Sequence, residues 1–190
     1  VTGAVTPATI LPLLERHFGD WQAPTSARPA RADIASAAAT PGTRVFLLDR
    51  PGAPQTSILA GQLMPSSQAP DRIELNTAND IVGGTFTSRI NMNLREDKHW
   101  SYGARSSLTE TRGQRPWLLS APVQTDKTVE SIQEIRRELA DLLATRPITA
   151  EEFAKVRNRD VRALSGQYET NAAASGAIGD IVRFGRADDY

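Results

Sequence analysis

The stretch GGTFTSRINMNLREDKHWSYGARSS, residues 83–107, holds the most informative pattern in the chain. A glycine pair opens it, and glycines let one helix end and another begin at close range. Apolar residues then recur every four positions, which predicts an amphipathic helix from about Thr85. Its apolar face would hold Phe86, Ile90 and Leu94. The spacing matches neither glycine-rich phosphate-binding motif, so the glycines indicate a structural junction.

Two residues that can bind a ligand, Arg95 and Tyr102, stand seven positions apart at the end of this stretch. Arg95 falls near the C-terminal end of the predicted helix, where a cation complements the helix dipole or pairs with Glu96 or Asp97. Tyr102 falls at the start of the next predicted strand, a usual place for an aromatic residue. Spacing alone therefore favours a structural explanation, with a joint site as the alternative.

Apolar runs on either side of this stretch predict a sheet. The expected strands are 43–50, 55–64, 102–111 and 115–124. The first two are joined by the turn PGAP, and the last two form a hairpin around Arg112 and Gly113. The first run is apolar on both faces, which indicates a central strand covered on at least one side. Pro116 and Pro122 confine the last strand to an edge or to bulged pairing, because proline donates no hydrogen bond.

Helical periodicity accounts for most of the remaining chain. The expected helices are 7–18, 71–84, the one from Thr85, 126–145, the one after the capping box of Thr149 and Glu152, and 171–185. Thr6 suits the N-cap of the first helix and Gly19 its C′ position. Pro12 moves the regular start of that helix to about Thr9. In 71–84 the expected buried stripe is Ile73, Ala78, Ile81 and Val82.

The order of these elements predicts an α+β fold, with an antiparallel or mixed sheet and helices packed mainly on one face. Residues 22–43, rich in Ala, Pro, Ser, Thr and Arg, predict a long surface connector. We expect residues 1–190 to be a single domain, truncated at both ends, of a longer protein. VTGAV looks like a strand entered partway, and RFGRADDY stops without closure.

Composition excludes several functions. The 22 basic residues balance the 22 acidic ones, which argues against a nucleic-acid partner. No apolar run reaches the roughly 20 residues that span a bilayer. The absence of cysteine excludes disulfides and thiolate chemistry, and leaves both the periplasm and the cytoplasm open as the compartment. No nucleophile motif is present, and the two histidines, His17 and His99, are far apart, so the chain alone predicts no metal site.

The run GGTFTSRINMNLREDKHWSYG resembles the signature of the second domain of pitrilysin, insulysin and mitochondrial-processing-peptidase type zinc peptidases, in a bacterial form. The matching residues are Gly83, Gly84, Phe86, Ser88, Arg89, Leu94, Arg95, Glu96, Tyr102 and Gly103. The segments VTGAVTPATILPLLERHFGDW, PGAPQTSILAG and PITAEEFAKVRN follow in the family's order. The resemblance therefore covers nearly the whole chain.

This resemblance implies a half-clamshell domain of a multi-domain inverzincin metallopeptidase. Zinc would be bound by an H-x-x-E-H motif in another domain, of the same chain or of a partner subunit, and this chain holds no metal and no catalytic residue. Arg95 and Tyr102 would bind a peptide or unfolded-protein substrate and support the transition state. The chain alone is then inactive, although it belongs to a hydrolase. The alternative is a non-catalytic subunit or scaffold domain of the same fold that acts in protein assembly.

Overall fold

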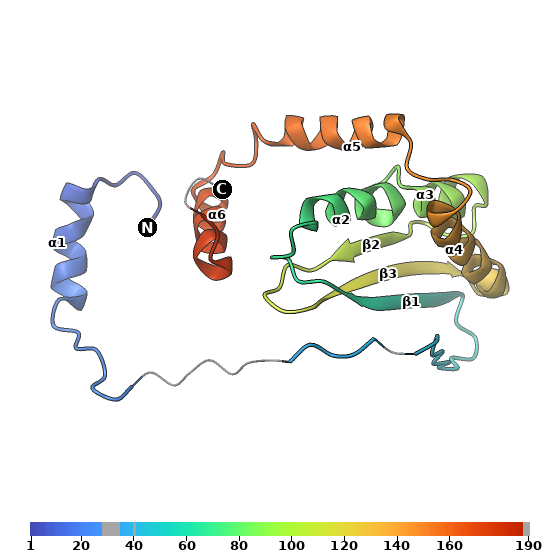
Figure 1. The fold of residues 1–190 in the computed structure, drawn as a ribbon, viewed down its shortest axis with the longest axis horizontal. Helices are drawn as coiled ribbons and strands as arrows, with labels where there is room; N and C mark the ends of the chain where they lie inside the picture. The colour runs from blue at the N-terminus through green and yellow to red at the C-terminus, as the bar shows by residue number, and fades with distance from the viewer. Residues whose placement is uncertain (28–34, 40, 188–190) are drawn as a thin grey trace. The chain divides into compact units, whose positions relative to one another are not determined.

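The computed structural model describes residues 1–27, 35–39 and 41–187, which form two compact units. The terminal unit consists of Val1–Ala35 with Arg162–Tyr190, and the central unit is Ser36–Val161. Figure 1 traces the elements in order: α1 (Pro7–Phe18), β1 (Gln55–Met64), α2 (Arg72–Asn79), η1 (Asp80–Gly84), α3 (Arg89–Asn91), η2 (Met92–Asp97), β2 (Arg105–Leu108), β3 (Arg115–Gln124), η3 (Thr125–Lys127), α4 (Thr128–Leu143), α5 (Ala150–Ala163) and α6 (Asn171–Phe184). In the described part of the chain, no helix is long and apolar enough to cross a membrane.

The terminal unit contains α1, which begins where its capping signal predicts, and α6, which begins at Asn171 as expected and is capped by Thr170. The Thr6 side chain caps α1 through the backbone N–H of Thr9, in a reciprocal capping box. The prediction that Pro12 delays the helix was wrong, since α1 starts at Pro7 and Pro12 lies inside it. Gly19 ends the helix as its C-cap residue, in the right-handed conformation, and so lies one position before the predicted C′.

The central unit is built on a three-stranded antiparallel sheet in the order β1-β3-β2. This sheet and its helices confirm the predicted α+β class and the predicted hairpin. The prediction that the prolines confine β3 to an edge or to bulged pairing was wrong, because β3 is the central strand and its register with β1 is continuous. β2 pairs only with residues 117–120, and Pro116 and Pro122 lie just outside that segment, opposite Leu63 and Ser57 of β1. A short neighbouring strand therefore lets the central strand contain two residues that lack an N–H donor.

Residues 43–50, predicted to be a covered central strand, form no strand in the structure. Their backbone joins no ladder, and Val45, Phe46, Leu47 and Leu48 are all exposed. A strand must pair with the edge of another strand. β1 pairs only with β3 among the described strands, so residues 43–50 do not pair with the other edge of β1. The predicted connector at 22–43 falls partly outside the described residues, and its described residues are exposed and irregular.

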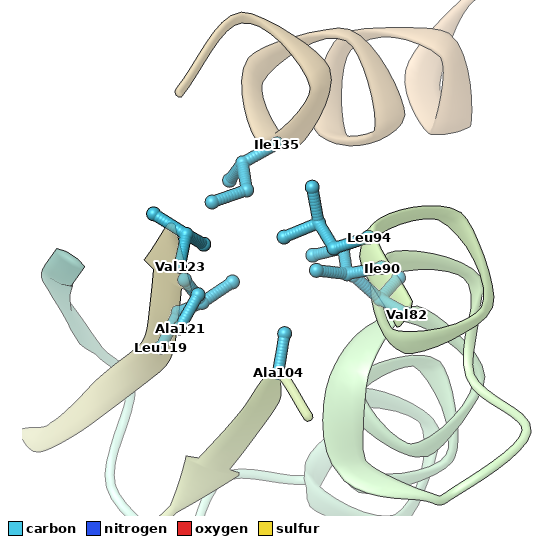
Figure 2. Packing of buried hydrophobic residues seen from close by; sticks show 8 residues of the cluster. All are labelled: Val82, Ile90, Leu94, Ala104, Leu119, Ala121, Val123 and Ile135. Carbon is cyan, nitrogen blue, oxygen red and sulfur yellow. The ribbon is translucent and has the colours of Figure 1, made fainter. Parts of the chain in front are cut away.

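The helices of the central unit cover one face of the sheet, and the core lies between them. Figure 2 shows Ile135 of α4 above Val123 of β3, with Ile90 and Leu94 approaching from the helical segments beside it. The cluster consists of Val82, Ile90, Leu94, Ala104, Leu119, Ala121, Val123 and Ile135. The buried residues of β3 alternate along the strand, as expected when one face is covered. On the other face, Leu59, Leu63 and Leu118 are exposed.

The glycine pair joins two helical segments, as predicted, but through a widened turn. α2 continues into η1, a π-helical turn that contains both glycines. A Cβ atom at Gly83 would lie 2.4 Å from Ser106 Oγ of β2, so only glycine allows this helix to approach the strand so closely. The predicted burial of Ile73 was wrong, because that side chain is exposed, whereas Ile81 and Val82 are buried as expected.

The helix predicted from Thr85 begins only at Arg89, as α3, and continues as the π-helical turn η2. Ile90 and Leu94 are buried as predicted, but Phe86 precedes the helix and is exposed. Two π-helical turns thus lie close together in the chain, and such turns occur frequently at functional sites.

Arg89 ties this region to the start of α5. Its Nε and Nη2 atoms each donate to one carboxylate oxygen of Glu152 at 2.7 Å. Its Nη2 also donates to the carbonyl of Pro147 at 3.0 Å, and its Nη1 to that of Arg146. Glu152 accepts in addition from the backbone N–H of Thr149 at 2.9 Å, which confirms the predicted capping box. One buried arginine therefore fixes α3, the loop after α4 and the first turn of α5.

Candidate functional site

Arg95 and Tyr102 line the same open cavity of about 350 Å³ in the central unit. The cavity lies where η2, the following turn and the ends of two strands meet. Its lining consists of Gln55, Arg95, Glu96, His99, Trp100, Ser101, Tyr102 and Gln124. The two residues singled out in the sequence are thus brought together by the fold, one from a helical turn and the other from the turn before a strand.

Arg95 is held on the wall of the cavity by contacts along its side chain. Its guanidinium carbon lies 4.4 Å from the centre of the exposed Phe86 ring, which is a cation–π contact. Its Nη1 atom lies 3.4 Å from Glu96 Oε1, but without hydrogen-bond geometry. Nη1 is a buried atom without a hydrogen-bond partner, while the side chain as a whole is 34% exposed.

Tyr102 stands at the rim of the cavity and is 88% exposed. The expectation that it begins a strand was wrong by three residues, because β2 starts at Arg105. The turn beneath it is well anchored. Ser101 bridges to Val123 and donates from its hydroxyl to the Pro122 carbonyl at 2.6 Å. The backbone next to Tyr102 is therefore fixed, while the Tyr102 side chain is exposed to solvent.

Asn91 fixes this turn from the helical side. Its side-chain oxygen accepts from the backbone N–H of Ala104 at 2.9 Å, and its side-chain nitrogen donates to the Phe86 carbonyl. The same buried side chain thus positions the segment after Tyr102 and the segment under the Arg95 guanidinium. Rigid support of this kind keeps donors in place before a ligand arrives.

His99 could contact a substrate from its charged turn according to the sequence, although solvent exposure is the favoured interpretation, and in the structure it is exposed and also lines the cavity. It adopts a left-handed backbone conformation with φ of 58°, where glycine is the usual residue and other residues pay about 1–2 kcal/mol. The backbone N–H groups of Trp100 and Ser101 both donate to the Leu94 carbonyl, at 2.9 and 3.2 Å. This closes the end of η2 as a cap. No pattern in the sequence indicates the backbone conformation of His99.

The side chain and backbone of His99 are both held. Its Nδ1 atom lies 3.1 Å from the Arg95 carbonyl, and its own carbonyl accepts from the Gln124 side-chain nitrogen at 3.1 Å. The imidazole is therefore oriented against the same turn that carries Arg95. His17, by contrast, is exposed near the end of α1 in the terminal unit, where it complements the helix dipole.

No metal site forms from the described residues. Within 1–27, 35–39 and 41–187, no three His, Cys, Asp or Glu side chains are grouped so that they could hold an ion. The residues of the cavity do not fit zinc either. They are an arginine, a phenol and side-chain amides, with only one carboxylate and one imidazole. The cavity instead offers hydrogen-bond donors, which suit carbonyl or carboxylate oxygens.

Fold and site together define a class of protein domain: a two-layer α+β domain with an arginine and a tyrosine in an open cavity. The model of the family described as Peptidase M16 inactive domain matches residues 1–159, and the chain belongs to this family. No curated protein matches the chain.

Solved structures share the fold. The peptidase M16 inactive domain from Pseudomonas fluorescens is 23% identical with a TM-score of 0.76, over 86% of this chain and 38% of that one. A protease from Helicobacter pylori is 18% identical with a TM-score of 0.82, over 97% of this chain and 44% of that one. A chain of Complex III2 from Candida albicans is 15% identical with a TM-score of 0.57, over 72% and 35%. This chain thus spans less than half the length of each.

Proposed function

We propose that this chain is the substrate-binding domain that completes the active site of a zinc-dependent metalloendopeptidase. The observation that carries the proposal is the shared cavity of Arg95 and Tyr102. Membership of the Peptidase M16 inactive domain family supports a role beside a peptidase centre. The described residues hold no metal cluster, so the zinc ion would be bound by another domain, of the same chain or of a partner subunit.

The cavity residues would bind the main chain of a peptide. The Arg95 guanidinium offers several donors in a rigid fork, and its position over Phe86 limits the conformational freedom that binding must remove. The exposed Tyr102 hydroxyl would donate to a second carbonyl or to the oxygen that gains charge during hydrolysis. Donors fixed in advance at such an oxygen act without reorganisation at the moment of reaction. A zinc ion in the other domain would supply activation of the attacking water.

The test compares variants of the full-length protein in peptide hydrolysis. Removing one preorganised donor typically costs about 2.7–4 kcal/mol in the transition state. Arg95→Ala should therefore lower kcat/KM by about 100-fold or more, and Tyr102→Phe should lower it in the same direction. Arg136→Ala and Tyr168→Phe are matched controls, because both side chains are exposed and lie outside the cavity. Wild-type kinetics in both cavity variants would exclude the proposal.

A second candidate function is a scaffold or non-catalytic subunit in a protein assembly. It is favoured by one observation, the likeness of this fold to a chain of Complex III2. The two candidate functions predict different motifs in the neighbouring sequence. An H-x-x-E-H motif in the same open reading frame or in an adjacent one supports the peptidase, and its absence from both supports the scaffold.

A further inference from the structure

We propose that His99 is an additional substrate-binding residue, whose imidazole Nε2 accepts a hydrogen bond from a main-chain N–H of the bound peptide. This inference rests on the proposed function, because it requires a peptide in the cavity. It assigns to His99 a role complementary to those of Arg95 and Tyr102, which donate to peptide carbonyls.

The protein itself decides which ring nitrogen carries the proton. Nδ1 of His99 faces the Arg95 carbonyl at 3.1 Å, and a carbonyl oxygen can only accept. In the neutral ring Nδ1 therefore holds the hydrogen, and Nε2 keeps its lone pair. Within the part of the chain that the structure describes, Nε2 has no hydrogen-bond partner. The ring thus brings a free acceptor to the cavity that it lines.

A peptide main chain needs such an acceptor. Each residue other than proline presents an N–H as well as a carbonyl, and a buried N–H without a partner weakens binding. The Arg95 guanidinium can only donate, and the Glu96 carboxylate lies next to it in an ion pair. The Gln124 side-chain nitrogen is already engaged with the His99 carbonyl. Among the described lining residues, His99 and Gln124 therefore each have a side-chain donor engaged by the protein and a side-chain acceptor left for a ligand, and only the His99 donor is held against the Arg95 carbonyl.

The backbone of His99 points to the same role. The residue occupies a left-handed position that glycine would fill with less strain. Its neighbours hold the turn through the two hydrogen bonds to Leu94, which come from backbone atoms and would persist with glycine. Without the imidazole, the end of η2 would keep these two backbone hydrogen bonds and lose only the one from Nδ1 to the Arg95 carbonyl. A strained residue in a supported turn that lines a cavity is typical of a functional side chain.

The experiment uses the full-length protein and a random-sequence decapeptide pool, with cleaved peptides identified by mass spectrometry. The best-cleaved peptide is resynthesised as a series in which one amide at a time becomes an ester, which removes the N–H without adding bulk. At a single position of the series, not at the cleaved bond itself, the ester should lower kcat/KM of the wild-type protein by about 2- to 10-fold. This is the loss expected for one neutral hydrogen bond. In His99→Gly the same ester should have no further effect, and the parent amide peptide should show the loss instead, chiefly in KM.

Two controls separate the possible outcomes. His17→Ala removes the other histidine and should leave the whole ester series unchanged. Arg95→Ala is measured in parallel as a test of the proposed function. If Arg95→Ala is impaired while His99→Gly reproduces every wild-type ester effect, the role of His99 is refuted and the proposed function stands. If no peptide of the pool is cleaved, or if Arg95→Ala and Tyr102→Phe behave like the wild type, both proposals fail.

Discussion

The contact between Arg89 and Glu152 makes the stability of the central unit depend on pH. The two-pronged hydrogen bond from Arg89 lowers the pKa of Glu152 from 4.5 to about 2, helped by the hydrogen bonds from Thr149 and opposed by burial. A depressed carboxyl pKa stabilises the folded state above the unfolded pKa of about 4.5. That contribution is lost as the pH falls from about 4.5 towards 2.

The magnitude follows from the size of the shift. A fall from 4.5 to about 2 corresponds to about 3 kcal/mol, since one pKa unit is about 1.4 kcal/mol. The Glu152 side chain is 29% exposed, so solvent screening reduces this to about 2 kcal/mol. Less than half of the contribution should remain at pH 3, and nearly none at pH 2.

The assay is urea unfolding of the wild-type chain and of Glu152→Gln between pH 3 and pH 7. Glutamine retains the shape and can still serve a capping box, so the variant isolates the charge. The free-energy difference between the two proteins should be about 2 kcal/mol at pH 7 and should shrink steadily below pH 4.5. Glu151→Gln is the matched control, because Glu151 lies in the same first turn of α5 but is exposed. A difference that stays constant from pH 7 to pH 3 would refute the linkage to Glu152.

Two further predictions concern packing. Leu119→Ala, in the fully buried centre of the core, should lower the free energy of unfolding by about 2–5 kcal/mol, whereas Leu59→Ala on the open face of the same sheet should lower it by less than about 1 kcal/mol; equal losses in urea unfolding would contradict the one-sided core. Gly83→Ala should destabilise the chain by about 1–3 kcal/mol, because its Cβ would meet Ser106 Oγ at 2.4 Å. Gly113→Ala, whose Cβ would meet nothing within 4 Å, is its control, and an equal change in melting temperature for both would argue against this close approach.

Elements with local signals were predictable from the sequence. Thr6 and Thr149 cap their helices through neighbours three residues away, and such contacts need no knowledge of the rest of the fold. β1 and the hairpin were also predicted, because their apolar runs are bounded by turns. That residues 1–190 form one domain truncated at both ends stays a prediction, since the division into two compact units does not test it.

The predictions were wrong where the structure of a segment depends on residues that are distant in the sequence. The apolar run at 43–50 indicates a preference for burial, but it does not specify a surface that could cover it. The prolines of β3 correctly indicate missing donors, yet their effect depends on β2, which is too short to reach them. Ile73 and Phe86 fit an apolar face only if the helices are regular, and the π-helical turn at 80–84 and the late start at Arg89 change which side chains face the core.

The site was predictable in part, and for a different reason. Arg95 and Tyr102 were candidates by residue type, their joint role came from the resemblance, and both line one cavity in the structure, although their roles stay proposals. Spacing could not predict this arrangement, because it depends on the turn between them. The conformation of His99 follows from the hydrogen bonds that close this turn on the Leu94 carbonyl, which no residue pattern indicates.

Because η2 is a π-helical turn, the number of residues in it, as well as their identity, determines the geometry of the cavity. Each residue of an α-helix advances about 100° around the axis, and a π-helical turn accommodates one residue more than an α-helical turn. Deleting Met92 or Asn93, which precede Arg95 in η2, should rotate Arg95 by about 100° relative to Ile90, which lies before the deletion in the core. Such a deletion keeps every side chain of the cavity and still changes its geometry, so the length of this turn matters as much as its residues.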